Sequence, residues 1–240
     1  MSANKYYNEI QKLLERINET QYEKIIETSK LFARKVEEDK IVHFFGTGHS
    51  HMISIEMFVR AGGLANINAI LDDTITTAAG ARKGSKLEGL SGLAEIIWEQ
   101  YNIDKSDIMV IISNSGRNSV PVEMAMKAKK EGLTLIAITS LDHSRNCLSR
   151  HTSGKRLFEL ADIVLDNCVP GGDSLLEFGG IKSGPGSTMA GVFIVNSILS
   201  ETLKILNEKG IPLPIFTSQN VDGFNNDDLY RKYSSRIKHM

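Results

Sequence analysis

The stretch DIMVIISNSGRNSVPVEMAMKAKKEG, Asp107 to Gly132, contains the pattern that decides the fold. Its first six residues are mostly apolar, which is typical of a strand buried on both faces of a sheet. A loop rich in Ser, Asn and Gly follows, and then a helical pattern that starts around Pro121 and closes at Gly132. Proline suits the first helical turn and glycine the position after the last one. A buried strand that leads through a polar loop into a helix favours a parallel α/β sheet.

The same alternation of short apolar runs and helical patterns extends over most of the chain. The apolar runs are IVHFF (41–45), ANINAIL (65–71), DIMVII (107–112), LTLIAIT (133–139) and ADIVLD (161–166). Helical patterns lie between them in HMISIEMFVRA, SGLAEIIWEQY and SVPVEMAMKAKKEG, and a long helix is expected from about Ser187 to Lys209. The order predicts an α/β three-layer sandwich, with a parallel sheet and helices on both of its faces.

The two ends of the chain differ from this central part. Residues 3 to about 38 carry apolar side chains at helical spacing, among them Ile10, Leu13, Leu14 and Ile17. Such a face needs burial, so we expect this helix to pack against a second copy of the chain. The polar and aromatic tail is expected to be loose or docked on a neighbouring subunit.

Composition limits the classes of function. The 240 residues are 41% hydrophobic and 24% charged, with a net charge of -1, as in an ordinary globular protein. Lys and Arg are mixed with Asp and Glu, so we expect no nucleic-acid partner. Cys147 and Cys168 stand in no metal-ligand spacing, which favours free thiols in a cytoplasmic protein. No secretory h-region is visible and no run approaches about 18 apolar residues, so neither export nor a membrane partner is expected.

Two long glycine-rich segments, 76–92 and 167–187, are expected to be functional or mobile loops. The shorter loops that directly follow the strands are more informative, because ligands of such sheets bind at the carboxyl ends of the strands.

Residues 46–50, GTGHS, follow the first strand. A dinucleotide fingerprint would need a glycine at His51 and an acid about 20 residues later, where Asn66 and Asn68 stand. No GK[ST] follows, so a P-loop is also excluded. The loop therefore fits one small anion.

Residues 113–119, SNSGRNS, follow the third strand and lead into a helix. Hydroxyls and backbone N–H groups at a helix N-terminus suit a phosphate monoester. Ordinary capping by Ser and Asn is the alternative for one such loop, but two loops after neighbouring strands favour phosphate. His49 and His51 lack a matching carboxylate or HExxH motif, so no metal and no cofactor are expected.

GTGHS and SNSGRNS together resemble the two phosphate-binding loops of the sugar isomerase (SIS) domain family. The pair is similar to loops of phosphoheptose isomerase, of the isomerase half of glucosamine-6-phosphate synthase, and of N-acetylmuramic acid 6-phosphate etherase. The likeness extends over about residues 5–210, and the full length resembles stand-alone bacterial SIS proteins. It implies a five-stranded parallel sheet in flavodoxin-like order. It also implies a single SIS domain over 1–240, with an N-terminal helical stretch (3–38), a core (about 39–210) and a C-terminal tail (211–240).

The resemblance implies a sugar phosphate as the ligand. The residues expected around its phosphate and sugar are Gly48, Ser50, Arg60, Ser113, Asn114, Ser115, Asn118 and Ser119.

The catalytic positions depart from the relatives. Arg60 stands where phosphoheptose isomerases and the etherases carry a catalytic Glu, and Glu56 stands where the isomerases have a metal-binding His. Their Gln and His partners fall near Val192 and Ser200, which cannot do those jobs. Fold-level likeness therefore does not transfer their chemistry.

The candidate acids and bases are Glu56, Glu88, His143 and His151, with Asp173 as a weaker candidate. Each has an ordinary alternative: an ion pair with Arg60 for Glu56, a solvated loop charge for Glu88, and capping or packing for the histidines. The expected function is binding of a sugar phosphate and interconversion of its aldose and ketose forms by a homodimer or homotetramer. A phosphosugar-sensing module without catalysis and an etherase-like lyase are the alternatives.

Overall fold

The computed structural model describes all 240 residues. Its helices and strands are α1 (Ser2–Glu37), β1 (Val42–Gly46), α2 (His51–Met57), β2 (Ile67–Ile70), α3 (Ala81–Glu88), α4 (Leu93–Trp98), β3 (Ile108–Ile112), α5 (Ser119–Lys130), β4 (Thr134–Thr139), α6 (Leu141–Arg145), β5 (Ile163–Asp166), β6 (Leu176–Phe178), β7 (Ile181–Ser183), α7 (Ser187–Glu208) and α8 (Asp227–Tyr233). Short 3-10 turns occur at Gly48–Ser50, Asp73–Ile75, Thr77–Ala79 and Leu157–Glu159.

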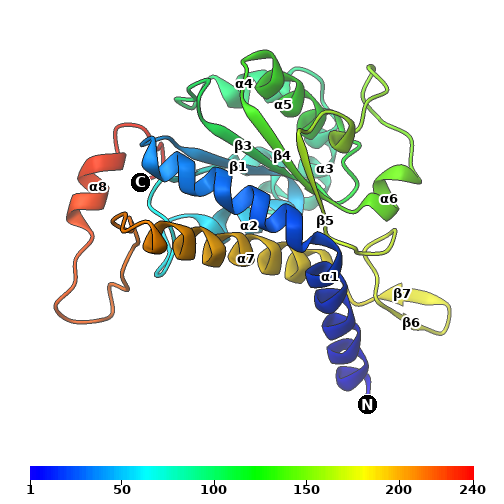
Figure 1. Cartoon of the computed structure of the whole chain (residues 1–240). Helices are drawn as coiled ribbons and strands as arrows, with labels where there is room; N and C mark the ends of the chain where they lie inside the picture. The colour runs from blue at the N-terminus through cyan, green and yellow to red at the C-terminus, as the bar shows by residue number, and fades with distance from the viewer.

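Five strands form one parallel sheet in the order β2-β1-β3-β4-β5, as expected. Helices α1, α2 and α7 cover one face, and α4 and α5 cover the other (Figure 1). Successive side chains of a strand point to opposite faces, so Phe44 packs in the core with Phe32 of α1, whereas Phe45 packs with Trp98 of α4. The predicted three-layer sandwich is confirmed.

The structure differs from the predicted elements mainly in the glycine-rich segments. Segment 76–92, expected to be a loop, contains α3, and segment 167–187 contains the antiparallel hairpin β6–β7. Glycine lowers helix propensity, so the sequence pattern around Gly84 did not predict the helix α3. A Cβ at Gly84 would lie 2.7 Å from the carbonyl oxygen of Thr76, which explains why a glycine stands there. The helix α2 ends earlier than its apolar pattern, because Phe58 is extended and Val59 adopts a φ of 41°.

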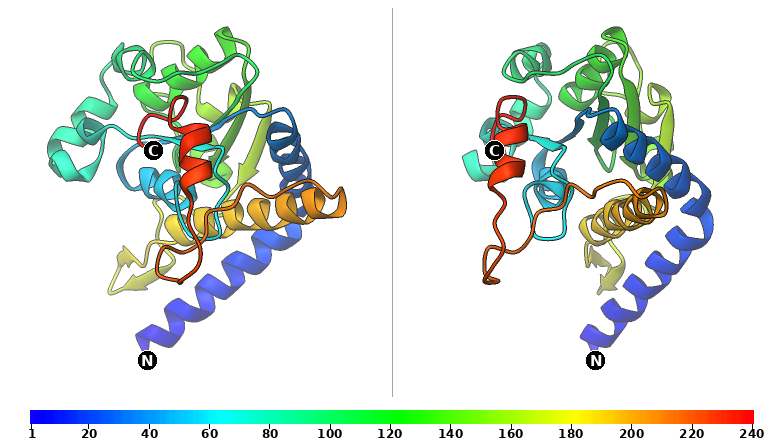
Figure 2. Two further views of the ribbon diagram at one scale, coloured as in Figure 1. Left: turned by 90° about the vertical axis from the view of Figure 1, so that its left-hand side faces the viewer. Right: turned by 60° about the vertical axis from the view of Figure 1, so that its left-hand side comes forward.

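The apolar face of α1 is buried inside its own chain. Ile10, Leu13 and Ile17 belong to the main core cluster together with residues of the sheet and α7. The face was expected to need a second copy, and that argument was wrong because the sheet and α7 supply the burial. The homodimer or homotetramer therefore stays a prediction without support from this face. The N-terminal half of α1 extends beyond the sheet beside the β6–β7 hairpin (Figures 1 and 2).

The C-terminal tail docks on its own chain. Tyr233 and Ile237 are buried in a small cluster with Ile41 and Ala65, next to β1 and β2. Figure 2 shows α8 lying against this side of the domain. Apolar residues spaced through a polar tail provide the contact, so the expectation of a loose or partner-bound tail was wrong.

The helix α7 is long and apolar enough to cross a membrane by length and composition. In the fold it is a core helix, because Ala190, Ile194, Val195 and Ile198 are buried against α1 and the sheet. A Cβ at Gly191 would lie 2.3 Å from Cδ1 of Ile53, so glycine allows α7 and α2 to approach closely.

A buried polar group joins three strands at the end of the sheet that carries their N-termini. The His43 Nε2 contacts Asp107 Oδ2 at 3.0 Å, and its Nδ1 contacts the Asn68 amide at 2.9 Å. Burial raises the pKa of the Asp107 carboxyl, but hydrogen bonds from His43 and the Ile41 N–H lower it by more, so the net pKa lies below the usual value. His43 is thus a buried residue of β1 with contacts at both ring nitrogens.

This depressed pKa implies a pH dependence of stability. A carboxyl whose pKa is lower in the folded chain stabilises it above its unfolded pKa of about 3.9, and this contribution is lost as the pH falls through the folded pKa. We expect Asp107→Asn to lower the free energy of unfolding by about 1–3 kcal/mol at pH 7, because partners of the buried group lose a charged acceptor. The difference from the wild type should shrink in acid. Urea unfolding at pH 7, 5 and 3, with the exposed Glu208→Gln as control, measures it; a constant difference would contradict it.

Candidate functional site

The carboxyl ends of the strands form a small polar pocket. Its walls come from four segments that are far apart in the sequence: the loop after β1, the loop after β3, the residue that follows β5, and the first turn of α7. The polar lining residues are Ser50, Asn114, Asn167, Ser187 and Thr188, and Ile53, Ile112 and Ile138 form its apolar base. The fold therefore brings the two predicted phosphate loops to one place.

The loop after β1 turns sharply because of its glycines. A Cβ at Gly46 would lie 2.6 Å from the backbone carbonyl of Ser50, so no larger residue fits without moving the turn. Gly48 has a φ of 53°, a conformation that glycine adopts without strain. The His51 Nδ1 contacts the Gly48 carbonyl, whereas His49 is exposed. The Ser50 hydroxyl makes no hydrogen bond within the chain and faces the pocket.

In the loop after β3, some side chains hold the loop in shape and others have no partner within the chain. The Ser113 hydroxyl accepts the Gly116 N–H at 3.2 Å, so it shapes the loop. Asn118 begins α5 and accepts a hydrogen bond from Arg150 at 3.1 Å. The hydroxyls of Ser115 and Ser119 make no hydrogen bond within the chain. These hydroxyls and the N-terminal N–H groups of α5 are free to donate to a ligand.

A pair of asparagines joins the loops after β3 and β5. The Asn167 Nδ2 donates to Asn114 Oδ1 at 2.8 Å, and the Val169 N–H donates to Asn167 Oδ1 at 3.1 Å. The amide N–H groups of Asn114 have no partner within the chain, so they can donate to a ligand, and its oxygen keeps one free lone pair. Sequence reasoning missed Asn167, although it directly follows a predicted strand, which is where ligand residues of such sheets lie.

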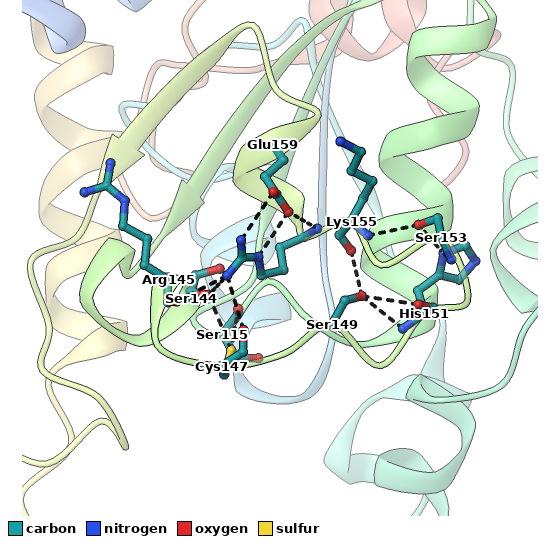
Figure 3. A network of polar contacts seen from close by, with 10 residues as sticks. Ser115, Ser144, Arg145, Cys147, Ser149, His151, Ser153, Lys155 and Glu159 are labelled. Atoms are coloured by element: carbon teal, nitrogen blue, oxygen red, sulfur yellow. Dashed lines mark hydrogen bonds and ion pairs between the residues drawn. The ribbon is translucent and has the colours of Figure 1, made fainter.

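A polar network fixes the outer side of the second loop (Figure 3). The Arg156 guanidinium donates to the carbonyls of Ser144, Arg145 and Cys147 at 3.0–3.2 Å and pairs with Glu159. Hydrogen bonds from Ser149 close the adjoining turn. Two backbone bonds, Leu157 N–H to the Gly116 carbonyl and Arg150 N–H to the Arg117 carbonyl, attach this segment to the phosphate loop. The loop is therefore preorganised by segment 144–159.

Glu56 lies on α2 and faces α7. Its Oε1 accepts the Asn196 amide at 2.9 Å and also pairs with Arg60. The ion pair given as the ordinary alternative thus forms, yet the Glu56 side chain keeps 22% of its surface exposed and its Oε2 has no partner in the chain. Arg60 itself lies beyond α2, beside tail residues such as Thr217, and does not reach the polar pocket.

Glu88 is brought to the first loop by α3. The Thr47 hydroxyl donates to its Oε1 at 2.6 Å, so the carboxylate sits beside the GTGHS turn rather than on a solvated loop. The sequence alone placed Glu88 in a long loop, and the helix explains its fixed position.

The two histidines do not meet at the pocket. His143, on α6, accepts a weak contact of 3.5 Å from the Gly172 N–H at its Nδ1. His151 lies farther along the chain, between Glu123 at 3.3 Å and Ser153 at 2.8 Å. Asp173 accepts hydrogen bonds at the N-terminus of α7. No group of three His, Cys, Asp or Glu side chains has metal-binding geometry.

Residues 5–140, more than half of the chain, match the SIS domain family. The chain belongs to this family. Curated relatives are similar to this chain over nearly its full length. UPF0309 proteins of Caldanaerobacter subterraneus subsp. tengcongensis and Thermoanaerobacter pseudethanolicus are each 40% identical to it, over 98% of this chain and 98% of the relative.

Solved structures agree with this fold. A phosphoheptose isomerase from Neisseria gonorrhoeae has a TM-score of 0.56 and 14% identity, and one from Francisella tularensis has a TM-score of 0.56 and 16% identity. Each comparison covers 85% of this chain and 97% of the other. At this identity the likeness establishes the fold of the SIS domain, and the chemistry must be argued from the site.

Proposed function

We propose that this SIS-domain protein binds a sugar phosphate and interconverts its aldose and ketose forms. The observation that carries the proposal is the set of unused donors at the carboxyl ends of β1 and β3. The hydroxyls of Ser50, Ser115 and Ser119 and the first N–H groups of α5 have no partner within the chain, whereas Ser113 and Asn118 each accept one hydrogen bond. Free donors around a helix N-terminus suit a phosphate dianion. The names of the phosphoheptose isomerases support a sugar as the remainder of the ligand.

Glu56 is the best-placed general base for the isomerisation. It follows Ser50 by six residues, which is about 9 Å along a helix, a span comparable to an extended sugar phosphate. Proton transfer beside the sugar carbonyl needs a carboxylate with a free oxygen, held in a fixed direction. Asn196 and Arg60 hold one oxygen of Glu56 and leave Oε2 free. Glu88, beside Thr47, is the second candidate acid or base.

Binding without reaction is the alternative, and one observation favours it. Glu56 already makes an ion pair with Arg60 and a hydrogen bond with Asn196, which are the contacts of a structural carboxylate. Exchange of the C2 proton of a bound sugar phosphate in heavy water separates the two functions. Exchange supports the isomerase, whereas firm binding without exchange supports a sensor.

The phosphate assignment predicts a thermal shift. Sugar phosphates, but not the matching free sugars, should raise the thermal midpoint, because a ligand that binds only the folded state at a hundredfold excess over Kd stabilises it by about 2.7 kcal/mol. For a chain of this size that is several degrees. Ser115→Ala and Ser119→Ala should each weaken binding by about tenfold, since each removes a hydrogen bond to a charged group. Ser183→Ala, on the exposed strand β7, is the control. A broad panel that gives no shift would refute the phosphate assignment.

A further inference from the structure

Asp173 places a carboxylate on the N-terminus of α7. Its Oδ1 accepts the N–H groups of Gly186 at 2.9 Å and Ser187 at 2.8 Å, and its Oδ2 accepts the Ser187 hydroxyl at 2.7 Å. A free helix N-terminus attracts anions. Here the chain's own carboxylate already takes those donors, although Ser187 also lines the polar pocket.

The hydrogen bond of Ser187 decides whether the α7 wall of the pocket donates to a ligand or accepts from it at this residue. A serine hydroxyl has one proton and two acceptor lone pairs. Because the proton is donated to Asp173, Ser187 presents only lone pairs to the pocket. The Asn114 amide N–H groups, in the loop after β3, have no partner within the chain and can donate to the pocket. The pocket therefore has free amide donors at the β3 loop, and Ser187 adds an acceptor to the α7 wall beside the Thr188 hydroxyl.

The chain holds Asp173 in this place by more than one contact. Its backbone has a φ of 54°, and its N–H donates to the Pro170 carbonyl in a tight turn. The preceding Gly171 N–H donates to Asp142 on α6 at 2.8 Å. An aspartate tolerates this left-handed conformation better than most residues. The loop that carries Asp173 is thus held by α6, and its carboxylate is held by the N-terminus of α7.

We propose that Asp173 is a positioning residue that sets the ligand selectivity of the pocket through Ser187. By turning Ser187 into an acceptor, it favours a ligand that presents a phosphate to the β3 loop and a hydroxyl to α7. Its own charge disfavours a ligand with a second anionic group at that end, because like charges brought together cost free energy. The selectivity rests on the proposed sugar-phosphate binding and narrows the substrate class to sugar phosphates with one anionic end.

A matched pair of probes tests this selectivity. Glucitol 6-phosphate and 6-phosphogluconate differ only in the hydroxyl or carboxylate at C1, and their Kd values are measured by calorimetry on the full chain. The wild type should prefer the alditol phosphate by about tenfold or more, and Asp173→Asn should tighten 6-phosphogluconate and bring the ratio towards one. Ser187→Ala should weaken the alditol phosphate without tightening the aldonate. Asp142→Asn, which removes the charge of a carboxylate bonded to the same loop, should leave the ratio unchanged.

The outcomes separate this inference from the proposed function. If the thermal panel shows sugar-phosphate binding and Asp173→Asn folds with an unchanged ratio, the role of Asp173 is overturned and the phosphate site stands. If Asp173→Asn does not fold, the Ser187→Ala variant provides the test. An affinity of Ser187→Ala for glucitol 6-phosphate equal to that of the wild type then overturns the proposed role of Asp173. If no sugar phosphate binds the wild type at all, both proposals are overturned together.

Discussion

Replacement of Glu56 by glutamine is expected to reduce turnover of a sugar phosphate by about 10²- to 10⁴-fold while its Kd changes little. Glutamine keeps the size and can still meet Asn196, but it cannot accept the proton beside the sugar carbonyl. Glu56 lies about two helical turns from Ser50, at the sugar end of the proposed site, so the phosphate contacts remain intact. Exchange of the C2 proton in heavy water measures the loss directly.

A matched carboxylate serves as the control for Glu56. Glu131 also forms an i,i+4 ion pair, with Lys127, but it lies at the other end of α5 from the phosphate loop. Glu131→Gln should leave both turnover and affinity unchanged. If Glu56→Gln kept near wild-type exchange, the base would be elsewhere, and Glu88→Gln would be the next variant. An unchanged Kd together with lost exchange assigns Glu56 to the chemical step rather than to binding.

Replacement of Gly46 by alanine is expected to damage both stability and binding. The added Cβ would lie 2.6 Å from the Ser50 backbone, which cannot move without shifting the whole turn between β1 and α2. Overpacking of this kind costs about 1–3 kcal/mol, and for a chain of this size each kcal/mol lowers the thermal midpoint by about 2–4 °C. Since Ser50 lines the polar pocket, affinity for a sugar phosphate should fall at least about tenfold.

Gly89→Ala is the control for the added methyl group. At Gly89 the nearest atom to a new Cβ lies at 3.4 Å, an ordinary contact, and its φ of -86° suits alanine. Its thermal midpoint should match or slightly exceed that of the wild type. Scanning calorimetry with and without ligand compares the variants. Wild-type stability and affinity in Gly46→Ala would show that the turn relaxes easily and that its tightness is not needed.

Local patterns were sufficient for the strands of the sheet and for the positions of the two polar loops after β1 and β3. The apolar runs of β1 and β3 are buried on both faces, and a strand of that kind can be read from its own few residues. Pro121 and Gly132 mark the two ends of α5 for the same local reason. The helix α3 was missed because Gly84 lowers its helix propensity, and the close approach of Thr76 that requires this glycine appears only in the folded chain.

The partners of the candidate site residues could not be read in this way. Asn196 reaches Glu56 from a helix 140 residues later in the chain, and Thr47 reaches Glu88 across 41 residues. The direction in which such side chains point cannot be read from the sequence, because it is set by the packing of α7 on α2 and of α3 on the first loop. Asp173 and Ser187 are a further example, since their bond depends on how the segment with the β6–β7 hairpin returns to α7.

By itself, then, the sequence determined the layered parallel fold and the two loops that present donors at the ends of β1 and β3, because strand burial, helix caps and tight turns depend on neighbouring residues. Only the tertiary structure decided which side chains of these loops have a partner inside the chain and which have none. Only the fold shows that Asn196 donates to Glu56 and that Asp173 accepts from the N-terminus of α7. Hydrogen bonds between distant segments form only when the packed helices and sheet bring the segments within reach.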